Sequence, residues 1–375
     1  MLSTTVGGLS LPTCVYNASG PRTGSSEALS RISATRAGAV LSKSATLEAQ
    51  KGNPLPRYVN GIDLGSEMCQ GSMNSEGLPN KGFAYYNSEE TSGEVLEAMK
   101  GEKPFILSLS GLKLEDNLEM IKQALKNDAA SSIELNLACP NIPGKPTIAY
   151  DFQQLGDVLA AVGKIRSIKS KPLGVKLAPY FDMPHIAEAA RIINEHKSFV
   201  RYVVTCNTIG NALIVDSDNE MAAIVPKGGY GGLAGGYIKY TALANVKKLR
   251  EYLDDDIDIV GVGGVRSGRD AFELILCGAN AVQVGTQHWT EGPRCFDRIC
   301  GELEELMKKK GYSSIDDFRG KLREFQKGAP RKKINLGGDK NSGGKVGGSG
   351  NESSLLRAII VVLLAIIAFL LQNKI

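Results

Sequence analysis

Residues 133–146 read Ile-Glu-Leu-Asn-Leu-Ala-Cys-Pro-Asn-Ile-Pro-Gly-Lys-Pro and mark a point where a strand turns abruptly into a loop. The stretch opens as a strand and breaks at Pro140, because proline has no N–H to donate to a neighbouring strand. Asn136, Cys139 and Asn141 therefore lie at the strand end and on the loop that leaves it. A thiol between two amides suits a site that holds a planar polar ring and moves one proton. The alternative interpretation is a buried cysteine beside turn-forming residues.

Strand-like runs rich in Val, Ile and Leu recur along the chain, at 14–19, 39–43, 105–110, 132–137, 173–177, 202–207, 257–261 and 281–285. Helices are predicted between and after the later runs, at 114–127, 152–168, 184–196, 241–253, 269–277 and 290–310. Such alternation indicates parallel βαβ units. Eight of them favour the α/β class and a closed (β/α)8 TIM barrel over an open doubly wound sheet, which is the alternative.

Two segments do not fit this alternation. Residues 52–87 are rich in Gly, Pro, Asn and Tyr, and residues 208–240 contain the glycine cluster at 228–236. Long insertions in compact domains usually serve as covers or binding loops. The glycine cluster is either a flexible loop or a place where backbone approaches a flat ligand closely, because no Cβ intervenes.

Charge and cysteine content narrow the class of protein. The residues after 320 include ten Lys and Arg and three acidic residues, so their net charge is +7. Because the whole chain has a net charge of +4, residues 1–320 have a net charge of −3. A mildly acidic main body gives no electrostatic sign of nucleic-acid binding. The seven cysteines are scattered and the three histidines lie far apart, which supports neither a disulfide framework nor a zinc site. The first residues lack the basic start and apolar run of a secretory signal.

In a barrel, chemistry belongs at the carboxyl ends of the strands. Lys43 and Lys176 close otherwise apolar strands, where burying them is costly without an anionic partner. Gly263-Gly264 and Gly285-Thr286 follow the last two strands, where barrels commonly bind phosphate. The polar residues and glycines at the predicted strand ends are Asn17, Ser19, Lys43, Ser44, Asn136, Lys176, Asn207, Thr208, Gly263, Gly264, Gly285 and Thr286.

Several motifs carry a resemblance to a known family. They are Asn17-Ala-Ser-Gly20, Ser42-Lys-Ser-Ala-Thr46, Gly52-Asn-Pro-Leu-Pro-Arg57, Asn74-Ser-Glu-Gly-Leu-Pro-Asn80 and the stretch 134–146 with its continuation Ala149-Tyr-Asp-Phe152. From about residue 2 to 322 the chain resembles the dihydroorotate dehydrogenases of family 1, and most closely the fumarate-dependent subclass 1A. Subclass 1B enzymes look different after Pro140, and family 2 looks like an enzyme with a serine base and a helical N-terminal extension.

The resemblance implies a (β/α)8 barrel that binds FMN, forms a homodimer and oxidises dihydroorotate to orotate in pyrimidine (UMP) biosynthesis, with fumarate reduced to succinate in the same site. It makes Cys139 the base that takes the C5 proton while the C6 hydride goes to the flavin, and it makes Lys43 an electrostatic stabiliser of the reduced ring. The implied substrate-binding residues are Lys43, Asn74, Gly77, Leu78, Asn136, Asn141, Asn207 and Thr208. The implied FMN-binding residues are Ser19, Lys43, Ser44, Asn136, Lys176, Gly235, Gly263, Gly264, Gly285 and Thr286.

Three residues depart from the family pattern. Ala138 stands where these enzymes usually have Ser, and Thr208 replaces a Ser but keeps its hydroxyl. Glu76 occupies a substrate-loop position expected to be uncharged, so its carboxylate is expected to point outward. The residues support the chemistry independently, since a thiol with an unperturbed pKa of about 8.5 can act as a base without a partner His. Asn side chains can satisfy both donors and acceptors on a pyrimidine-dione ring.

Two other functions remain open at this point. A related flavin barrel could use another acceptor, such as a quinone or NAD; the intact Pro-Gly-Lys-Pro loop argues against it. A membrane-tethered scaffold could retain the barrel without activity; the presence of Lys43, Cys139, Lys176 and the Asn set argues against that.

The composition changes after Gln326. Residues 337–350 contain seven glycines, which predicts a flexible linker spanning roughly 20 Å. Residues 355–371 are apolar apart from Arg357, and as a helix they would span about 25 Å. The sequence thus predicts a catalytic domain at 1–326, a basic linker at 327–354 and a transmembrane segment at 355–371. A cytosolic enzyme anchored to the endoplasmic reticulum or the mitochondrial outer membrane is the expected location.

Overall fold

The computed structural model describes residues 1–63, 70–99, 101–139 and 147–325. The chain divides into two units, residues 1–332 and 333–375, and everything described here belongs to the first. The predicted linker at 327–354 and the predicted transmembrane segment at 355–371 lie outside the described residues. Within the described ranges, no helix is both long and apolar enough to cross a membrane.

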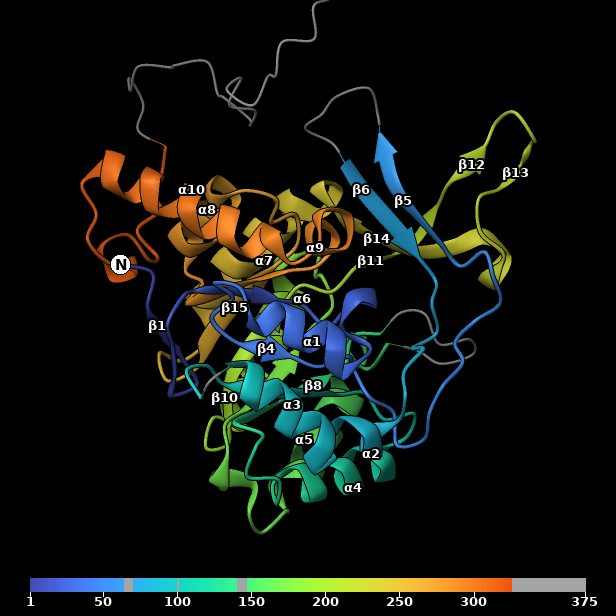
Figure 1. Ribbon diagram of the computed structural model, residues 1–375, viewed down its shortest axis with the longest axis horizontal. Helices are drawn as coiled ribbons and strands as arrows, with labels where there is room; N and C mark the ends of the chain where they lie inside the picture. Colours follow the sequence, from blue (N-terminus) through green and yellow to red (C-terminus); the bar gives the residue numbers. More distant parts are fainter. Residues whose placement is uncertain (64–69, 100, 140–146, 326–375) are drawn as a thin grey trace, which may run out of the picture. The chain divides into compact units, whose positions relative to one another are not determined.

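The core of the first unit is a nearly closed barrel of parallel strands (Figure 1). Its eight strands are hydrogen-bonded in the order β3-β16-β15-β10-β9-β8-β7-β4. Their bounds are β3 Val15–Asn17, β4 Val40–Leu41, β7 Phe105–Leu109, β8 Ser132–Asn136, β9 Leu173–Lys176, β10 Val200–Thr205, β15 Asp258–Val262 and β16 Ala281–Val284. Each overlaps a predicted run. Neighbours follow the order of the chain around the sheet, whereas a doubly wound sheet reverses that order, so the barrel prediction is confirmed.

A side chain bridges the seam between the first two barrel strands. β3 and β4 are not hydrogen-bonded to each other as strands. Instead Asn17 Nδ2 donates to the Leu41 carbonyl oxygen at 2.7 Å, and the Leu41 N–H donates to Asn17 Oδ1 at 3.0 Å. The Asn17 amide thus imitates a backbone pair. This buried residue joins the barrel wall and does not line the site, although it stands at a strand end.

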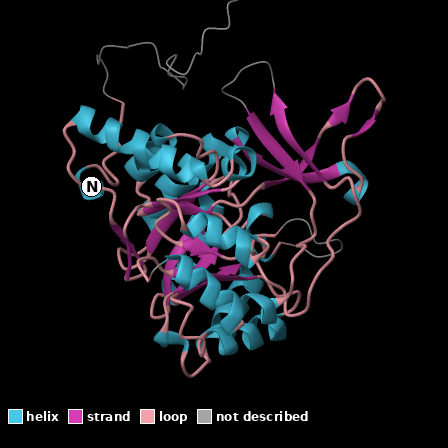
Figure 2. Ribbon diagram, viewed as in Figure 1, coloured by secondary structure: helices cyan, strands magenta, loops and turns pink. Residues whose placement is uncertain are grey.

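Helices cover the outside of the barrel (Figure 2). Their bounds are α1 Ser26–Ser33, α2 Phe83–Tyr86, α3 Glu89–Met99, α4 Leu114–Ala124, α5 Phe152–Gly163, α6 Met183–Glu195, α7 Lys239–Tyr252, α8 Gly268–Cys277, α9 Thr286–Glu291 and α10 Arg294–Lys310. Polar side chains fix several starts, because Asp151 caps α5, Asp182 caps α6 and Ser267 caps α8. α4 and α5 end earlier than predicted.

The prediction of one helix over 290–310 is wrong. Two helices, α9 and α10, occupy this region and meet at Gly292 and Pro293. Gly292 has φ +84° and ψ −172°, a conformation open essentially to glycine alone. Pro293 then removes a backbone donor at the point where α10 begins. The apolar periodicity continues across the break, which is why it suggested a single helix.

The two segments that did not fit the alternation contain strands of their own. β5 Tyr58–Asp63, β6 Gln70–Asn74, β11 Ile209–Leu213 and β14 Tyr230–Gly235 form a four-stranded sheet in the order β11-β14-β6-β5. β12 Val215–Asp216 and β13 Met221–Ala222 form a small hairpin beside it (Figure 1). Gly71 of β6 lies against the Tyr237 ring, since a Cβ there would come within 2.2 Å of a ring carbon. An N-terminal hairpin joins β1 Thr4–Val6 to β2 Leu9–Leu11.

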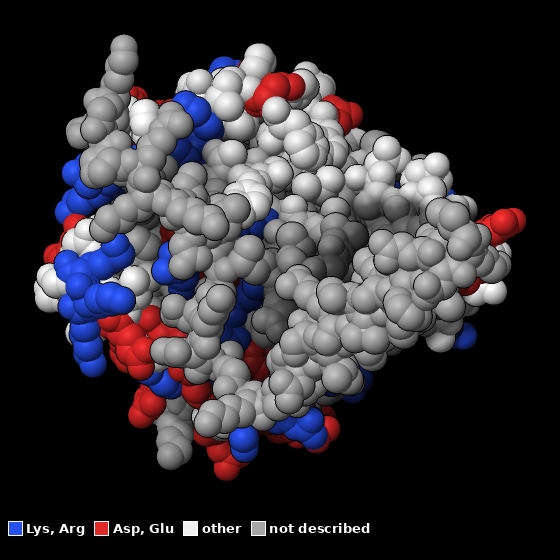
Figure 3. All heavy atoms as spheres, turned by 90° about the horizontal axis from the view of Figure 1, so that it is seen from above, with Lys and Arg blue, Asp and Glu red and all other residues white. Residues whose placement is uncertain are grey.

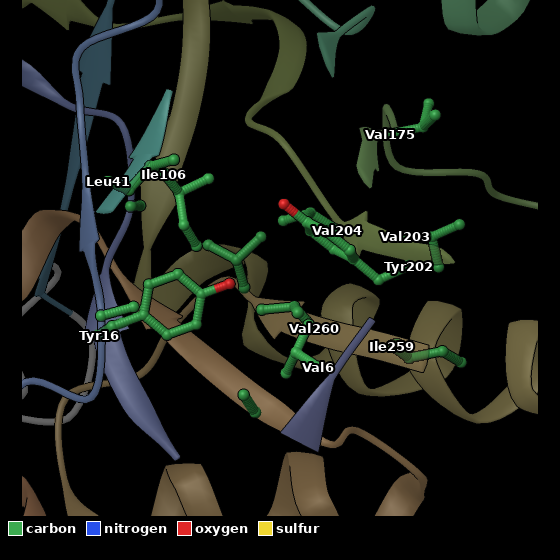
Figure 4. Packing of buried hydrophobic residues seen from close by; sticks show 14 of the residues in the cluster. Val6, Tyr16, Leu41, Ile106, Val175, Tyr202, Val203, Val204, Ile259 and Val260 are labelled. Atoms are coloured by element: carbon green, nitrogen blue, oxygen red, sulfur yellow. The ribbon is translucent and has the colours of Figure 1, made fainter. Parts of the chain in front are cut away.

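The barrel interior is apolar near its walls and contains a few polar side chains. Figure 4 shows the Tyr16 ring pointing inward toward Val204 and Val260. Glu134 is fully buried, and its Oε2 accepts a hydrogen bond from Gln283 Nε2 at 2.7 Å. Burial raises the pKa of Glu134, although nearby Lys176 and the Gln283 bond oppose that shift. On the outer surface visible in Figure 3, Lys and Arg side chains lie next to Asp and Glu side chains.

Candidate active site

A cavity opens at the carboxyl ends of the barrel strands. Parallel strands bring all their carboxyl ends to one rim, so residues far apart in the sequence meet there. Every described residue to which the family resemblance gave a role in the site lines this cavity: Ser19, Lys43, Ser44, Asn74, Gly77, Leu78, Asn136, Cys139, Lys176, Asn207, Thr208, Gly235, Gly263, Gly264, Gly285 and Thr286. Asn141 lies outside the described residues.

Two buried lysines lie on the cavity wall. Lys43 and Lys176 are 7% and 4% exposed. Lys43 Nζ lies 3.8 Å from Glu76 Oε2, whereas no carboxylate of the described residues forms an ion pair with Lys176. Burial lowers the pKa of Lys43, and Glu76 and Cys139 oppose that shift. The cavity therefore holds positive charge that an anionic ligand can neutralise.

Hydroxyl groups and an amide form one hydrogen-bonded row across the strand ends. The Ser44 N–H donates to Ser19 Oγ at 2.6 Å, and Ser44 Oγ lies 2.8 Å from Ser108 Oγ. Asn136 Nδ2 donates to Ser44 Oγ at 3.2 Å. This row fixes the side chains beside Lys43 in place, so their remaining donors and acceptors face the cavity in a set arrangement.

The amide groups of Asn136 and Asn207 hold the strand end from which Cys139 projects. Asn136 Oδ1 accepts from the Ala138 N–H at 3.1 Å, and Asn207 Nδ2 donates to the Ala138 carbonyl oxygen at 2.8 Å. Asn207 Oδ1 in turn accepts from the Thr208 N–H at 2.8 Å. Two strands, β8 and β10, therefore fix the backbone immediately before the thiol.

Two thiols line the cavity, and their surroundings differ. Cys206 is almost fully buried, and burial raises its pKa to about 12 even though nearby Lys176 opposes the shift. Cys139 is only partly buried. It also contributes to the electrostatic environment of Lys43. A thiol that has to take a proton in neutral solution must reach its thiolate form, so the surroundings favour Cys139 over Cys206 as a base.

The expectation that the Glu76 carboxylate points outward is wrong. Glu76 is 9% exposed, lines the cavity and pairs with Lys43. The next two residues, Gly77 and Leu78, have φ of +68° and +56°. Positive φ is uncommon for a leucine, and Asn80 Nδ2 supports this turn by donating to the Leu78 carbonyl oxygen at 2.8 Å. The double left-handed turn directs Glu76 inward, which the sequence alone does not reveal.

Glycines and hydroxyl groups form another part of the cavity. Gly263 and Gly264 follow β15, Gly285 and Thr286 follow β16, and these two strands are neighbours in the barrel. Ser72 Oγ of β6 lies 3.1 Å from Thr286 Oγ1. Gly263 and Gly264 have φ of +128° and +75°, so a side chain at either position would be strained. The predicted phosphate-binding residues are thus brought together.

Further lining residues were not predicted as site residues. Among them are Ser72, Cys206, Arg266, Gln283 and Trp289. Arg266 comes two residues after Gly264, so a cation close to a glycine-rich strand end was the available signal. Ser72 comes from the sheet formed by the inserted segments. Its position depends on the pairing of β6 with β14, which no local pattern discloses.

Comparison with known proteins identifies the family. The sequence profile of the family described as "Dihydroorotate dehydrogenase" matches residues 1–307. The chain belongs to the dihydroorotate dehydrogenase family.

Relatives in this family are similar along most of the chain. Dihydroorotate dehydrogenase A (fumarate) of Lactococcus lactis subsp. lactis is 45% identical over 325 residues, which cover 87% of this chain and 100% of that protein. The putative dihydroorotate dehydrogenase A (fumarate) of Streptococcus agalactiae serotype V is 44% identical over 321 residues, covering 86% and 98% of the two chains.

Solved structures agree on the fold. A ferulenol complex of DHODH from Eimeria tenella aligns with this chain at a TM-score of 0.69 and 21% sequence identity. The alignment covers 85% of this chain and 88% of that one. The ligand-free Eimeria tenella structure gives the same TM-score of 0.69 at 22% identity.

Proposed function

We propose that this protein is a fumarate-type dihydroorotate dehydrogenase, which oxidises dihydroorotate to orotate in pyrimidine biosynthesis and passes the electrons to fumarate. The observation that carries the proposal is the cavity at the strand ends. It combines a partly exposed thiol, Cys139, with two buried lysines and a set of amides, in a member of the dihydroorotate dehydrogenase family. Relatives named as the fumarate enzyme match along nearly their whole length.

The residues present suit FMN as the cofactor. Among the described residues, Lys176 is a buried cation without an ion pair, and Thr208 Oγ1 is a buried atom without a hydrogen-bond partner. At Gly285 an added Cβ would meet only Ala18, so backbone borders open space there. FMN would be held by Ser19, Lys43, Ser44, Asn136, Lys176, Gly235, Gly263, Gly264, Gly285 and Thr286. When bound, it supplies the acceptor for the hydride of dihydroorotate.

The side chains of the cavity would take the proton, stabilise developing charge and bind the substrate. Cys139 takes the C5 proton of dihydroorotate, because its thiol is partly exposed in the cavity. Lys43 supplies positive charge close to the reacting ring and stabilises negative charge that develops there. The substrate's polar edges are held by Asn74, Gly77, Leu78, Asn136, Asn207 and Thr208 of the described residues, and by Asn141, which lies outside them.

Fumarate is favoured over a quinone as the acceptor because the cavity is lined by charged and amide groups. Lys43, Lys176 and Arg266 are all present in its wall, and they suit a small dicarboxylate. The test is anaerobic turnover of dihydroorotate by the purified protein with fumarate, a quinone analogue or NAD, compared side by side. We expect a yellow protein, turnover with fumarate, and competition between orotate and fumarate. Turnover with a long-chain quinone and none with fumarate would contradict the proposal, and a colourless, inactive protein would favour a scaffold.

The proposal also covers location and assembly. Residues 355–371 would anchor the enzyme to the endoplasmic reticulum or the mitochondrial outer membrane, with the catalytic unit in the cytosol; the support is the length and apolar character of that sequence. A homodimer is supported by exposed apolar side chains on and beside the four-stranded sheet, namely Leu213, Val215, Met221, Val225 and Tyr230.

A further inference from the structure

Glu76 differs in charge from the other charged residues that line the cavity. Among the described lining residues, Lys43, Lys176 and Arg266 are basic and Glu76 alone is acidic. The Glu76 and Lys43 side chains are 11% and 9% exposed, and Oε2 lies 3.8 Å from Nζ. A carboxylate in a site that would bind anionic ligands opposes their binding, so its presence there requires a reason.

Hydrogen bonds that involve the backbone of the Glu76 loop hold it in place, and the Glu76 side chain takes no part in them. The Asn53 N–H donates to the Glu76 carbonyl oxygen at 2.8 Å, and the Ser75 N–H donates to the Arg57 carbonyl oxygen at 2.8 Å. Asn53 Nδ2 donates to the Ser75 carbonyl oxygen at 2.8 Å. Among the described residues, the Glu76 carboxylate has one polar interaction, which is the ion pair with Lys43. Replacing this side chain therefore leaves the anchoring of the loop intact.

The Lys43 ammonium needs a compensating charge. Burial lowers the pKa of Lys43, and Lys176 at the end of β9 and Arg57 before β5 lower it further. Glu76 opposes the shift most strongly, and Cys139, which follows β8, opposes it less. Among the described residues, these four groups are the charged and titratable ones that act on Lys43. Without Glu76, the remaining opposing influence is that of Cys139, and Lys43 loses its proton at a lower pH.

We propose that Glu76 is a positioning residue that keeps Lys43 protonated in the ligand-free cavity and reduces the preference of the cavity for dianionic over monoanionic ligands. The first effect follows from the ion pair. The second follows because a fixed negative charge repels two ligand charges more than one. The inference rests on the proposed function for its choice of ligands, fumarate as the dianion and orotate as the monoanion.

The test compares anion binding by wild-type and Glu76→Gln holoenzyme in their oxidised state, measured by titration calorimetry at pH 6.5. Removing one charge a few ångströms from a ligand carboxylate changes a binding constant by about three- to tenfold per ligand charge in a wet cavity. We therefore expect the dissociation constant of orotate to fall by about threefold and that of fumarate by about tenfold. Equal changes for both ligands would overturn the role in charge discrimination.

The same titrations with fumarate from pH 6.5 to 9.5 test the effect on Lys43. Because Lys43 in the Glu76→Gln variant loses its proton at a lower pH, the affinity of the variant for fumarate should decline earlier as the pH rises. The two affinity curves should therefore converge or cross at alkaline pH. Curves that stay parallel would overturn the role in holding the Lys43 proton, since loss of packing alone shifts affinity without changing its pH dependence.

Three control variants separate charge from structure. Glu48→Gln removes a carboxylate from an exposed position on a neighbouring segment and should leave both ligands and the pH profile unchanged. Glu76→Asp keeps the charge and should retain the wild-type pH dependence. Glu76→Ala also removes the charge, with a smaller side chain, and should give the same changes in affinity as Glu76→Gln. It serves as the test variant if Glu76→Gln loads flavin poorly.

The two proposals can fail separately. A wild-type enzyme that binds both anions but does not reduce its flavin with dihydroorotate would overturn the proposed function, while the Glu76 comparison would still decide this inference. A wild-type enzyme that binds neither anion would overturn both.

Discussion

At the scale of single residues, the site depends on which of the two cavity thiols can lose a proton. Cys139 is partly exposed beside Lys43, whereas Cys206 is buried and burial raises its pKa to about 12. The sequence pointed to Cys139 through the break at Pro140 and the flanking amides, and the family resemblance implied its role as the base. It could not compare the two thiols, because their burial depends on the packing of β8, β10 and β15 around them.

Replacing Cys139 tests its role directly. In Cys139→Ala we expect FMN to remain bound and flavin reduction by dihydroorotate to slow by about 10²–10⁴-fold, the usual contribution of a general base. Cys139→Ser should help little at neutral pH and recover in part at alkaline pH. Stopped-flow bleaching of the flavin measures both, and Cys206→Ala controls for removal of a thiol. Reduction of the alanine variant at the wild-type rate would remove Cys139 from the mechanism.

The protonation of His288 should affect the stability of the folded protein. It is 4% exposed, its ring lies 5.2 Å from that of Phe296, and burial, followed by the charge of Arg22, lowers its pKa to about 4. In the unfolded chain a histidine has a pKa of about 6.5. The unfolded state therefore binds the extra proton first as the pH falls, and the stabilising contribution present above pH 6.5 declines toward pH 4.

We expect this contribution to amount to about 3 kcal/mol of unfolding free energy between pH 7 and pH 4. Denaturant unfolding of wild type and His288→Gln at several pH values measures it, because the stability difference between them should shrink by about that amount on acidification. His196→Gln, at a less buried histidine whose pKa burial also lowers, should give a smaller change. Identical pH slopes for wild type and His288→Gln would contradict the assignment.

At the scale of elements, the break between α9 and α10 shows how one backbone conformation overrides a helical pattern. Gly292 has φ +84° and ψ −172°, and a Cβ added there would meet no atom within 4 Å. Any cost of a side chain at this position is therefore conformational. Gly301 lies inside α10 with equally open space around a Cβ. The two glycines allow the same substitution to be compared in opposite backbone settings.

Gly292→Ala should destabilise the fold by about 2 kcal/mol, because alanine is strained in that conformation. Gly301→Ala should instead stabilise it by about 0.5–1 kcal/mol, because alanine loses less conformational entropy in a helix than glycine does. Chemical denaturation measures both changes. Stabilisation by both substitutions would show that α9 and α10 can join into the single helix that the sequence predicted.

At the scale of the whole molecule, the barrel is complete before the predicted linker begins. All eight barrel strands and the helices that cover them end before residue 326. Residues 337–350 contain seven glycines, which favours a flexible tether between the catalytic unit and the proposed anchor. Catalysis should therefore not depend on residues 329–375.

Ending the chain near Gly328 should give a yellow and active enzyme that does not sediment with membranes. The full chain should stay with membranes after carbonate washing. Removal of 355–371 alone keeps the basic cluster at 331–333, so it separates insertion of the apolar segment from charge attraction to lipid. Loss of flavin from the shortened enzyme would show that the tail belongs to the fold, and the anchor proposal would then fail.

The sequence by itself determined the barrel, its eight strands and many of the residues that line its site. Apolar runs and helices can be recognised locally, and parallel strands necessarily bring their carboxyl ends to one rim, so the strand-end residues of the site follow from strand order. The site residues on the inserted segments were expected from the family resemblance. Only the tertiary structure decided that Asn17 joins β3 to β4, that β6 pairs with β14, and that Glu76 faces Lys43. Each of these depends on contacts between segments separated in the sequence by loops. No short-range pattern of apolar or polar residues encodes the direction in which such a loop turns.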